Sequence, residues 1–254
     1  MTALWITGTS LIILFMISLW ALYYKKTNAG IVDIGWAFCF VIASSVALLF
    51  GDAGFSKKII LALMVYPWSL RLTYYLWSRF DKSVEDPRYT KIKQRWGNDS
   101  SGLKFLGMFV FQAILASIIA LPIYFIANEP AWGFLPIGFV IVSIGWIGEA
   151  IADYQMQQFK AIPDNKGKIM DQGLWGISRH PNYFFEWLVW VGFTISAIWA
   201  PYSYLSLISL GIISYLLMGL SGVRLTEEHL AESRGVEWKK YKERTPPFFP
   251  RLFS

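Results

Sequence analysis

The chain has 254 residues, of which 55% are hydrophobic, 18% are aromatic and only 16% are charged. A soluble domain carries about 25% charged residues, so this composition excludes an ordinary soluble fold and favours a membrane protein. A single cysteine, Cys39, excludes an internal disulfide, and two histidines are too few for a histidine-based metal site. The net charge of +6 fits anionic lipid headgroups or a phosphorylated ligand. We therefore expect contact with membrane lipids and no bound metal.

Apolar segments of about 20 residues, the length that spans a bilayer, recur along the chain. We count seven, at residues 3–24, 31–50, 58–78, 104–127, 132–154, 183–200 and 202–222. The predicted fold class is all-α: a polytopic membrane protein whose seven transmembrane helices form a single membrane domain over residues 1–254. After the last span, the segment from Glu227 to Tyr241 is typical of a cytoplasmic amphipathic helix, which either caps a functional site or anchors the tail at the membrane surface.

Lysine and arginine gather in alternate connections, and this asymmetry predicts the orientation of the chain. The connections at 79–104 and 155–182 and the C-terminal tail are rich in both, whereas those near 128–132 and 198–203 contain neither. We expect the basic side to be the cytoplasm of a bacterial inner-membrane type protein, with the C-terminus inside. Lys57 and Lys58, on the predicted outer side, go against this pattern. Nucleic acid is a poor partner, because the basic residues lie in short loops between apolar spans.

Several charged residues lie within or at the ends of the predicted spans, namely Asp33, Arg71, Glu149, Asp153 and Glu186. A charge at the bilayer centre costs about 2.5–3.5 kcal/mol on insertion scales, so these side chains should face the bundle interior and find partners. For Asp33 and Arg71 two interpretations stay open. They form a structural ion pair that locks the bundle, or they belong to a functional site.

The segment from Ser178 to Glu186 concentrates polar groups at the start of an apolar helix. Pro181 suits the first turn of a helix, where its missing N–H has no partner. The free backbone N–H groups and the positive dipole of such a helix start favour an anion. Arg179 and His180 add donors for phosphate. This segment therefore predicts a site for the phosphates of a cofactor.

Two pairs of polar residues add acceptors to the same region. Glu149 and Asp153 are four residues apart, as are Asn182 and Glu186, so each pair shares one face of a helix. Such groups can accept from ribose hydroxyls, a carboxamide or an adenine amine. The sequence has no Gly-rich dinucleotide fingerprint and no P-loop, which excludes a soluble Rossmann domain.

These residues belong to a longer pattern: Asp153-Tyr154, Gln158, Lys160, Gly173-Leu174-Trp175, Asn182-Tyr183, Glu186 and Trp190. The pattern resembles the C-terminal domain of the steroid 5α-reductases. The whole chain resembles the bacterial DUF1295 branch of that family, which shares a superfamily with the isoprenylcysteine carboxyl methyltransferases. The resemblance implies that residues 104–254 bind NADPH and that residues 1–103 supply substrate-side helices. With the polar residues described above, the predicted cofactor-binding set is Glu149, Asp153, Lys160, Lys168, Arg179, His180, Asn182, Tyr183, Glu186, Arg224 and Glu228.

The chain departs from the steroid enzymes at several of these positions. Glu149 stands where they have Asn, and Lys160 and Lys168 stand where they have Arg. Lysine is a point charge without the bidentate fork of arginine, so the affinity for phosphate should differ.

The substrate side departs further. The steroid enzymes polarise an enone carbonyl with a Gln-Glu pair in the second span and a Tyr in the third, and this chain lacks the pair. Asp33 in the second span and Tyr66 and Tyr74 in the third are the nominated catalytic residues. The resemblance implies hydride transfer from NADPH to the β-carbon of a conjugated C=C bond in a hydrophobic molecule, a 3-oxo-steroid-like enone or an enoyl lipid. An acid near the carbonyl oxygen would stabilise the developing enolate.

Two other functions stay open. Isoprenylcysteine and phospholipid methyltransferases, which use S-adenosylmethionine, share an Arg-His-Pro-x-Tyr-x-Gly segment and two adjacent Glu after the last span. Here Arg179-His180-Pro181 and Glu227-Glu228 match, but Phe185 holds the Gly position and would crowd a cofactor that needs close backbone approach. The third possibility is a lipid-binding protein without enzymatic activity. The oligomeric state is not predicted.

Overall fold

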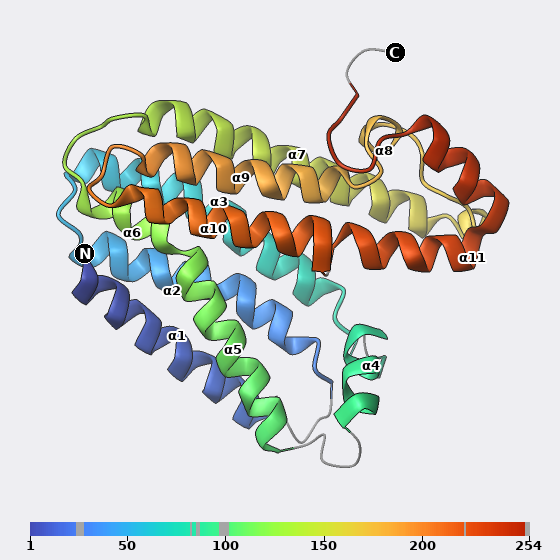
Figure 1. Cartoon of the computed structure of the whole chain (residues 1–254), viewed down its shortest axis with the longest axis horizontal. Coiled ribbons are helices and arrows are strands. Elements are labelled where there is room, and N and C mark those ends of the chain that lie inside the picture. The colour runs from blue at the N-terminus through green and yellow to red at the C-terminus, as the bar shows by residue number, and fades with distance from the viewer. Residues whose placement is uncertain (24–27, 82, 85–86, 97–101, 221, 252–254) are drawn as a thin grey trace. The chain divides into compact units, whose positions relative to one another are not determined.

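The computed structural model describes residues 1–23, 28–81, 83–84, 87–96, 102–220 and 222–251 (Figure 1). Within these ranges the chain is helical and has no β-strand, which confirms the predicted all-α class. The chain divides into two compact units. Unit 1 consists of Met1–Gly133 and Ala197–Ser206, and unit 2 consists of Phe134–Ser196 and Leu207–Ser254.

Six segments among the described residues are long and apolar enough to cross a membrane, so the chain is an integral membrane protein. They are α1 (Thr2–Tyr23), α2 (Ile31–Phe50), α3 (Phe55–Ser78), the pair α5 (Leu103–Ile119) and α6 (Leu121–Asn128), α7 (Leu135–Ala161), and the segment Ser203–Glu228. The predicted count of seven spans is not confirmed. The remaining apolar helix, α9 (Pro181–Ala197), has 17 residues, about the shortest length that spans a bilayer.

The central helix of unit 1 is α2, which packs against α1, α3, α5 and α6. Its Phe40 lies against Trp68 of α3, with 5.3 Å between the ring centroids, and both rings are fully buried. The Ser69 hydroxyl of α3 donates to the Ala37 carbonyl of α2 at 2.7 Å, so polar as well as aromatic contacts fasten this pair. The helices α5 and α6, which follow residue 103, also pack within unit 1.

The start of α2 also holds the segment that follows α3. The side-chain amide of Asn28 donates to the carbonyls of Asp81 and Val84, at 2.7 and 3.2 Å. Beyond this segment lies the short helix α4 (Pro87–Trp96), whose Tyr89 hydroxyl donates to Asp33 Oδ1 at 2.5 Å. Two contacts therefore fix the connection between α3 and α5 to the same end of α2.

In unit 2, α7 and α9 run antiparallel and lie side by side (Figure 1), with glycines where their backbones meet. A Cβ at Gly138 would overlap the Ser196 hydroxyl, and one at Gly145 would lie 2.7 Å from Val189. A Cβ at Gly192 of α9 would likewise lie 2.9 Å from the backbone of α7. Small residues let apolar helices approach closely and gain packing contacts, which is a common way for membrane helices to associate.

The remaining elements of unit 2 are a 3₁₀ turn (Pro163–Asn165), α8 (Leu174–Ile177), α10 (Ser206–Tyr215), a π-helical turn (Leu216–Leu220) and α11 (Val223–Arg244). Of these, α10 runs back along α9, and the others lie near the end of α7 and the start of α9 (Figure 1). The predicted tail helix is present as α11, and it is kinked at Gly235, where φ is 49°. A side chain there would be strained, because only glycine adopts this backbone conformation freely.

Candidate functional site

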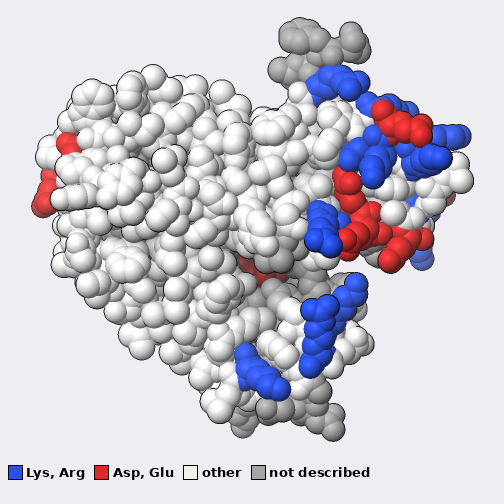
Figure 2. All heavy atoms as spheres, viewed as in Figure 1, with Lys and Arg blue, Asp and Glu red and all other residues white. Residues whose placement is uncertain are grey.

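Charged side chains gather in unit 2 over α11 and the loop that precedes α8 (Figure 2). This is the end of the unit where α7 stops and α9 begins. Residues 181–215, which include α9 and α10, contain one charged residue, Glu186, and it lies in the second turn of α9 near this end. Most of the predicted cofactor-binding residues lie on the elements that meet here.

As predicted, α9 begins at Pro181, and the residues just before it are held by the C-terminal segment. The Ser178 hydroxyl donates to the Phe248 carbonyl at 2.8 Å and accepts from the His180 N–H at 3.2 Å. The backbone N–H of Arg179 donates to the Pro246 carbonyl at 2.9 Å. The start of α9 is therefore fixed by residues about 70 positions later in the chain.

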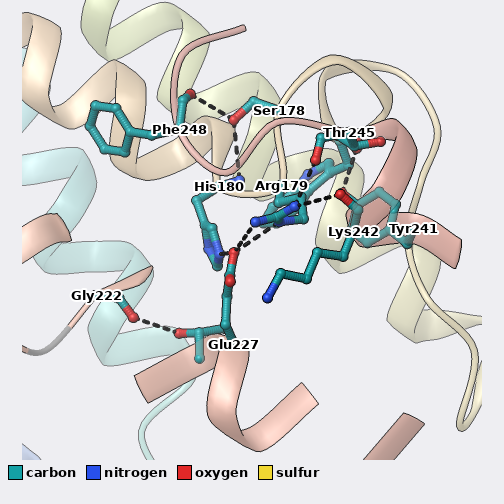
Figure 3. A network of polar contacts seen from close by, with 11 residues as sticks. Ser178, Arg179, His180, Gly222, Glu227, Tyr241, Lys242, Thr245 and Phe248 are labelled. Atoms are coloured by element: carbon teal, nitrogen blue, oxygen red, sulfur yellow. Dashed lines mark hydrogen bonds and ion pairs between the residues drawn. The ribbon is translucent and has the colours of Figure 1, made fainter. Parts of the chain in front are cut away.

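The buried guanidinium of Arg179 is the centre of a dense polar network (Figure 3). Its Nε and one terminal nitrogen both lie 2.8 Å from Glu227 Oε1. The other terminal nitrogen donates to the carbonyls of Lys242 and Thr245, at 2.9 and 2.8 Å. The guanidinium also lies 5.4 Å from the centre of the Trp238 ring. In this structure Arg179 thus ties α9 to both ends of α11, and the donors predicted for phosphate are directed at protein acceptors.

The imidazole of His180 faces the same carboxylate. His180 is 2% exposed, and its Nε2 lies 3.4 Å from Glu227 Oε1 (Figure 3). Its ring stacks on that of Tyr183, with centroids 5.5 Å apart and planes 3° from parallel. Glu227 therefore lies between the arginine and the histidine that start α9. The cofactor-binding prediction included its neighbour Glu228 and missed Glu227, although the sequence signal was the Glu227-Glu228 pair itself.

Three buried carboxylates lie on the facing helices. Glu149 and Asp153 of α7 and Glu186 of α9 are each less than 8% exposed. Gly148 packs against Phe185, which places Glu149 and Glu186 at the same level of the two antiparallel helices. Glu186 accepts from Trp190 Nε1 at 3.1 Å, one turn along α9. The structure therefore brings the two predicted acidic positions of α7 alongside the first turns of α9.

Asn182 and Tyr183, both half-buried, complete the first turn of α9. Among the described residues no donor reaches Asn182 Oδ1, although that atom is buried. A buried acceptor without a donor costs roughly 1–3 kcal/mol, so such atoms often mark the place of a ligand or water. The Asn182 amide is therefore a candidate ligand contact within the site.

The predicted cations lie at the surface. Lys160 in the last turn of α7 and Lys168 in the loop before α8 are exposed. Arg224 on α11 is exposed too, and it pairs with Glu228 at 3.0 Å. Arg224 and Glu228 border an open cleft of about 260 Å³ that is also lined by Glu227, Ala231, Trp238 and Lys242. A ligand in this cleft would meet two cations, two carboxylates and an indole.

A chain of buried hydrogen bonds connects the cleft to α7. The Tyr241 hydroxyl donates to the Trp175 carbonyl at 2.5 Å, and Trp175 Nε1 donates to the Ala152 carbonyl at 3.0 Å. Burial raises the pKa of Tyr241 above its usual value, so the hydroxyl stays protonated and can donate at any physiological pH. Residue 152 precedes Asp153, so α11 helps to position the acidic end of α7.

The nominated catalytic residues Asp33, Tyr66 and Tyr74 all belong to unit 1. The Tyr66 hydroxyl lies 3.1 Å from the Ser45 hydroxyl, and Tyr74 is 71% exposed. Asp33 accepts from the buried Tyr89 of α4. The sequence prediction missed Tyr89, because it searched for the tyrosine inside the third span.

The chain is similar to known proteins over most of its length. The model of a family described as "Protein of unknown function (DUF1295)" matches residues 19–245. The "Uncharacterized protein C594.04c" of Schizosaccharomyces pombe is 27% identical over 270 residues, which cover 92% of this chain and 76% of that protein. The "Probable O-methyltransferase ustE" of Ustilaginoidea virens is 40% identical over 50 residues, which cover 20% of this chain and 18% of that protein.

Proposed function

The chain belongs to the DUF1295 family of proteins of unknown function, and from that premise we propose that it is an integral-membrane reductase that uses NADPH. The proposed substrate is a hydrophobic molecule or lipid with an activated C=C bond. The proposed orientation places the C-terminus and the cofactor site on the cytoplasmic side of a bacterial inner membrane, in keeping with the basic connections.

The observation that carries the proposal is the acceptor cluster at the start of α9. Asn182 Oδ1 is buried without a donor among the described residues, and Glu149, Asp153 and Glu186 are buried on the turns beside it. A carboxamide, an amine and ribose hydroxyls are all donors, and a nicotinamide dinucleotide carries all three. The chemistry of this cluster therefore fits the uncharged parts of such a cofactor.

The exposed cations of unit 2 could bind the phosphate groups of a nicotinamide dinucleotide. Lys160, Lys168 and Arg224 are exposed at the end of unit 2 that carries the acceptor cluster. Their charge would favour NADPH over NADH, because the extra phosphate adds negative charge. When bound, NADPH supplies the hydride, whereas the residues of this chain bind and orient it and exclude water.

The acid on the substrate side is the pair formed by Asp33 and Tyr89. Tyr89 gives its one hydroxyl proton to Asp33, so in the proposed reaction a protonated Asp33 carboxyl group donates from its other oxygen to the carbonyl oxygen and stabilises the negative charge that develops there. Tyr89 donates to Asp33 at 2.5 Å, which orients both groups. In the proposed reaction this pair holds the substrate carbonyl, and Tyr66 and Tyr74 remain alternative donors.

Thermal unfolding in detergent tests the proposal directly. At a concentration a hundredfold above its Kd, a ligand stabilises by about 2.7 kcal/mol, which raises Tm by roughly 5–10 °C in a chain of this size. We expect this rise with NADPH, a smaller one with NADH, and its loss in Asn182→Ala and Glu186→Gln. Gln157→Ala, at an exposed position of α7, is the matched control and should keep the full shift.

A second function, methyl transfer from S-adenosylmethionine, is favoured by one specific contact. Glu227 binds Arg179 and faces His180, so the Glu-Glu and Arg-His-Pro features of the methyltransferases meet at one point in this structure. The short match to an O-methyltransferase points the same way. A thermal shift with S-adenosylmethionine and none with NADPH would replace the reductase proposal by this one. No shift with either ligand would reject both.

A further inference from the structure

The helix α4 has two sharply different faces. Tyr89, Ile92, Lys93 and Trp96, spaced as one face of a helix, are buried or half-buried, whereas the residues between them, Thr90, Lys91, Gln94 and Arg95, are all exposed. On the inner face, Trp96 meets Phe105 of α5 edge-on at 6.2 Å. The Lys104 ammonium donates to the Trp96 carbonyl at 3.2 Å and so caps the C-terminal end of the helix. The helix is therefore held to unit 1 by one face and presents the other outward.

The outward face of α4 carries positive charges that no acidic residue of the same helix neutralises. Lys91 and Arg95 are four residues apart on it, and the sequence from Pro87 to Trp96 contains no acidic residue. Like charges at this spacing destabilise a helix. The contrast with α11 is informative, because there Arg224 pairs with Glu228 at the same spacing. The repulsion on α4 would be relieved by an anionic partner outside the chain.

The position of α4 identifies that partner. Its ten residues, about 15 Å long, connect α3 with α5, two segments that can cross the membrane. Both ends of α4 are therefore close to the membrane boundary, on the side that the basic connections assign to the cytoplasm. Figure 2 shows the basic side chains of this region on the surface. We propose that the exposed face of α4, formed by Thr90, Lys91, Gln94 and Arg95, binds the phosphate groups of anionic phospholipids.

The contact would have a consequence for the interior of unit 1. Lys91 and Arg95 lie on the face opposite Tyr89, which donates to Asp33. Headgroups bound on the outer face would restrict the movement of α4, and Tyr89 moves with this helix. The proposal does not depend on the enzymatic function, because it concerns only the lipid contact of α4.

The experiment compares the full-length protein in nanodiscs of phosphatidylcholine, with and without roughly one third phosphatidylglycerol, whose headgroup is anionic. Native mass spectrometry measures how much of each lipid the released protein retains. We expect wild-type protein to enrich phosphatidylglycerol and Lys91→Gln/Arg95→Gln to lower that enrichment at least twofold. Lys239→Gln/Lys240→Gln removes two exposed charges from α11, beside Glu237 and Glu243, and is the matched control.

Four outcomes decide the proposal. Loss of enrichment in the α4 variant alone, with unchanged insertion and Tm in phosphatidylcholine, supports it. Equal enrichment in all three proteins overturns it, because the α4 charges would then act only in setting the orientation of the chain during insertion. Equal loss in both variants also overturns it, because binding would then follow net charge rather than this helix. A wild-type enrichment that inorganic phosphate abolishes while salt at the same ionic strength does not would indicate a soluble anion as the natural ligand, and it would overturn the assignment to lipid.

Discussion

Unit 1 and unit 2 hold their buried polar groups in different ways. In unit 2 the guanidinium of Arg179 contacts a carboxylate, two carbonyls and an indole, and so joins α9, α11 and the segment after α11. In unit 1 the carboxylate of Asp33 accepts from Tyr89 on a short helix between two spans. The Arg179 network gathers many contacts on one side chain between long elements, whereas the Tyr89–Asp33 hydrogen bond connects a ten-residue helix to the start of α2.

This difference predicts that the start of α9 is rigid and that α4 can change its position more easily. A side chain with four or more satisfied donors can move only if several bonds break together, so Arg179 should fix the geometry of the start of α9. A tyrosine on a ten-residue helix can move with that helix at lower cost. In the proposed reductase, a rigid unit 2 would suit a single cofactor, and an adjustable unit 1 would suit bulky hydrophobic substrates.

The largest expected effect comes from removing the centre of the unit 2 network. Arg179→Ala leaves the Glu227 carboxylate and two carbonyls without their donor, and breaking a buried ion pair costs about 3–5 kcal/mol. We expect the lower end of this range, because Glu227 is 18% exposed. Hydrogen exchange should rise in α11 and in residues 245–251, with little change in α1 and α2.

Arg224→Ala serves as the control for that experiment. Its pair with Glu228 lies at the surface, and exposed pairs of this kind contribute about 0–1 kcal/mol. If Arg179→Ala proves no more destabilising than Arg224→Ala, the network would not be what fixes this end of unit 2. The contrast between the two units would then lose its main support.

Much of the site could be predicted because its residues lie close together in sequence. The start of α9 at Pro181 followed from local helix rules, and the burial of Glu149 and Asp153 followed from the cost of charge in an apolar helix. The end of α7 was predicted too early, at residue 154, because apolar composition was the criterion. The helix continues to Ala161, since the following Gln, Met and Lys residues favour a helix without being apolar.

Contacts between distant parts of the chain could not be predicted in the same way. Arg179 and Glu227 are 48 residues apart, and Asp33 and Tyr89 are 56 apart. Neither pair has a spacing that local periodicity can reveal, because the intervening chain leaves the helix and returns. The Glu227-Glu228 pair was noticed as a motif, but its contact with Arg179 required the packing of α11.

An intermediate effect is expected at the interface of α7 and α9. Gly138→Ala places a methyl group against the Ser196 hydroxyl and the Gly192 carbonyl, and overpacking of this kind costs about 1–3 kcal/mol. Gly211→Ala on α10 is the matched control, since nothing lies within 4 Å of the added carbon. Its effect should be neutral or stabilising, because alanine favours a helix. Equal Tm values for the two variants would show that α7 and α9 adjust easily, contrary to a rigid unit 2.

The smallest effect on stability is expected at Asp33. Tyr89→Phe removes one hydrogen bond, which contributes about 0.5–1.5 kcal/mol, and Tyr66→Phe, which removes a comparable bond to Ser45, is the control for stability alone. If the Tyr89–Asp33 pair acts on the substrate, Tyr89→Phe should lower kcat for an enone at least tenfold while Tm falls by only a few degrees. A double-mutant cycle with Asp33→Ala separates this contact from other effects of each substitution. Strong coupling in kcat with weak coupling in stability would mean that unit 1 keeps this contact for chemistry. The reverse result would make the pair a structural link between α2 and α4, and the proposed chemical role of this hydrogen bond would be rejected.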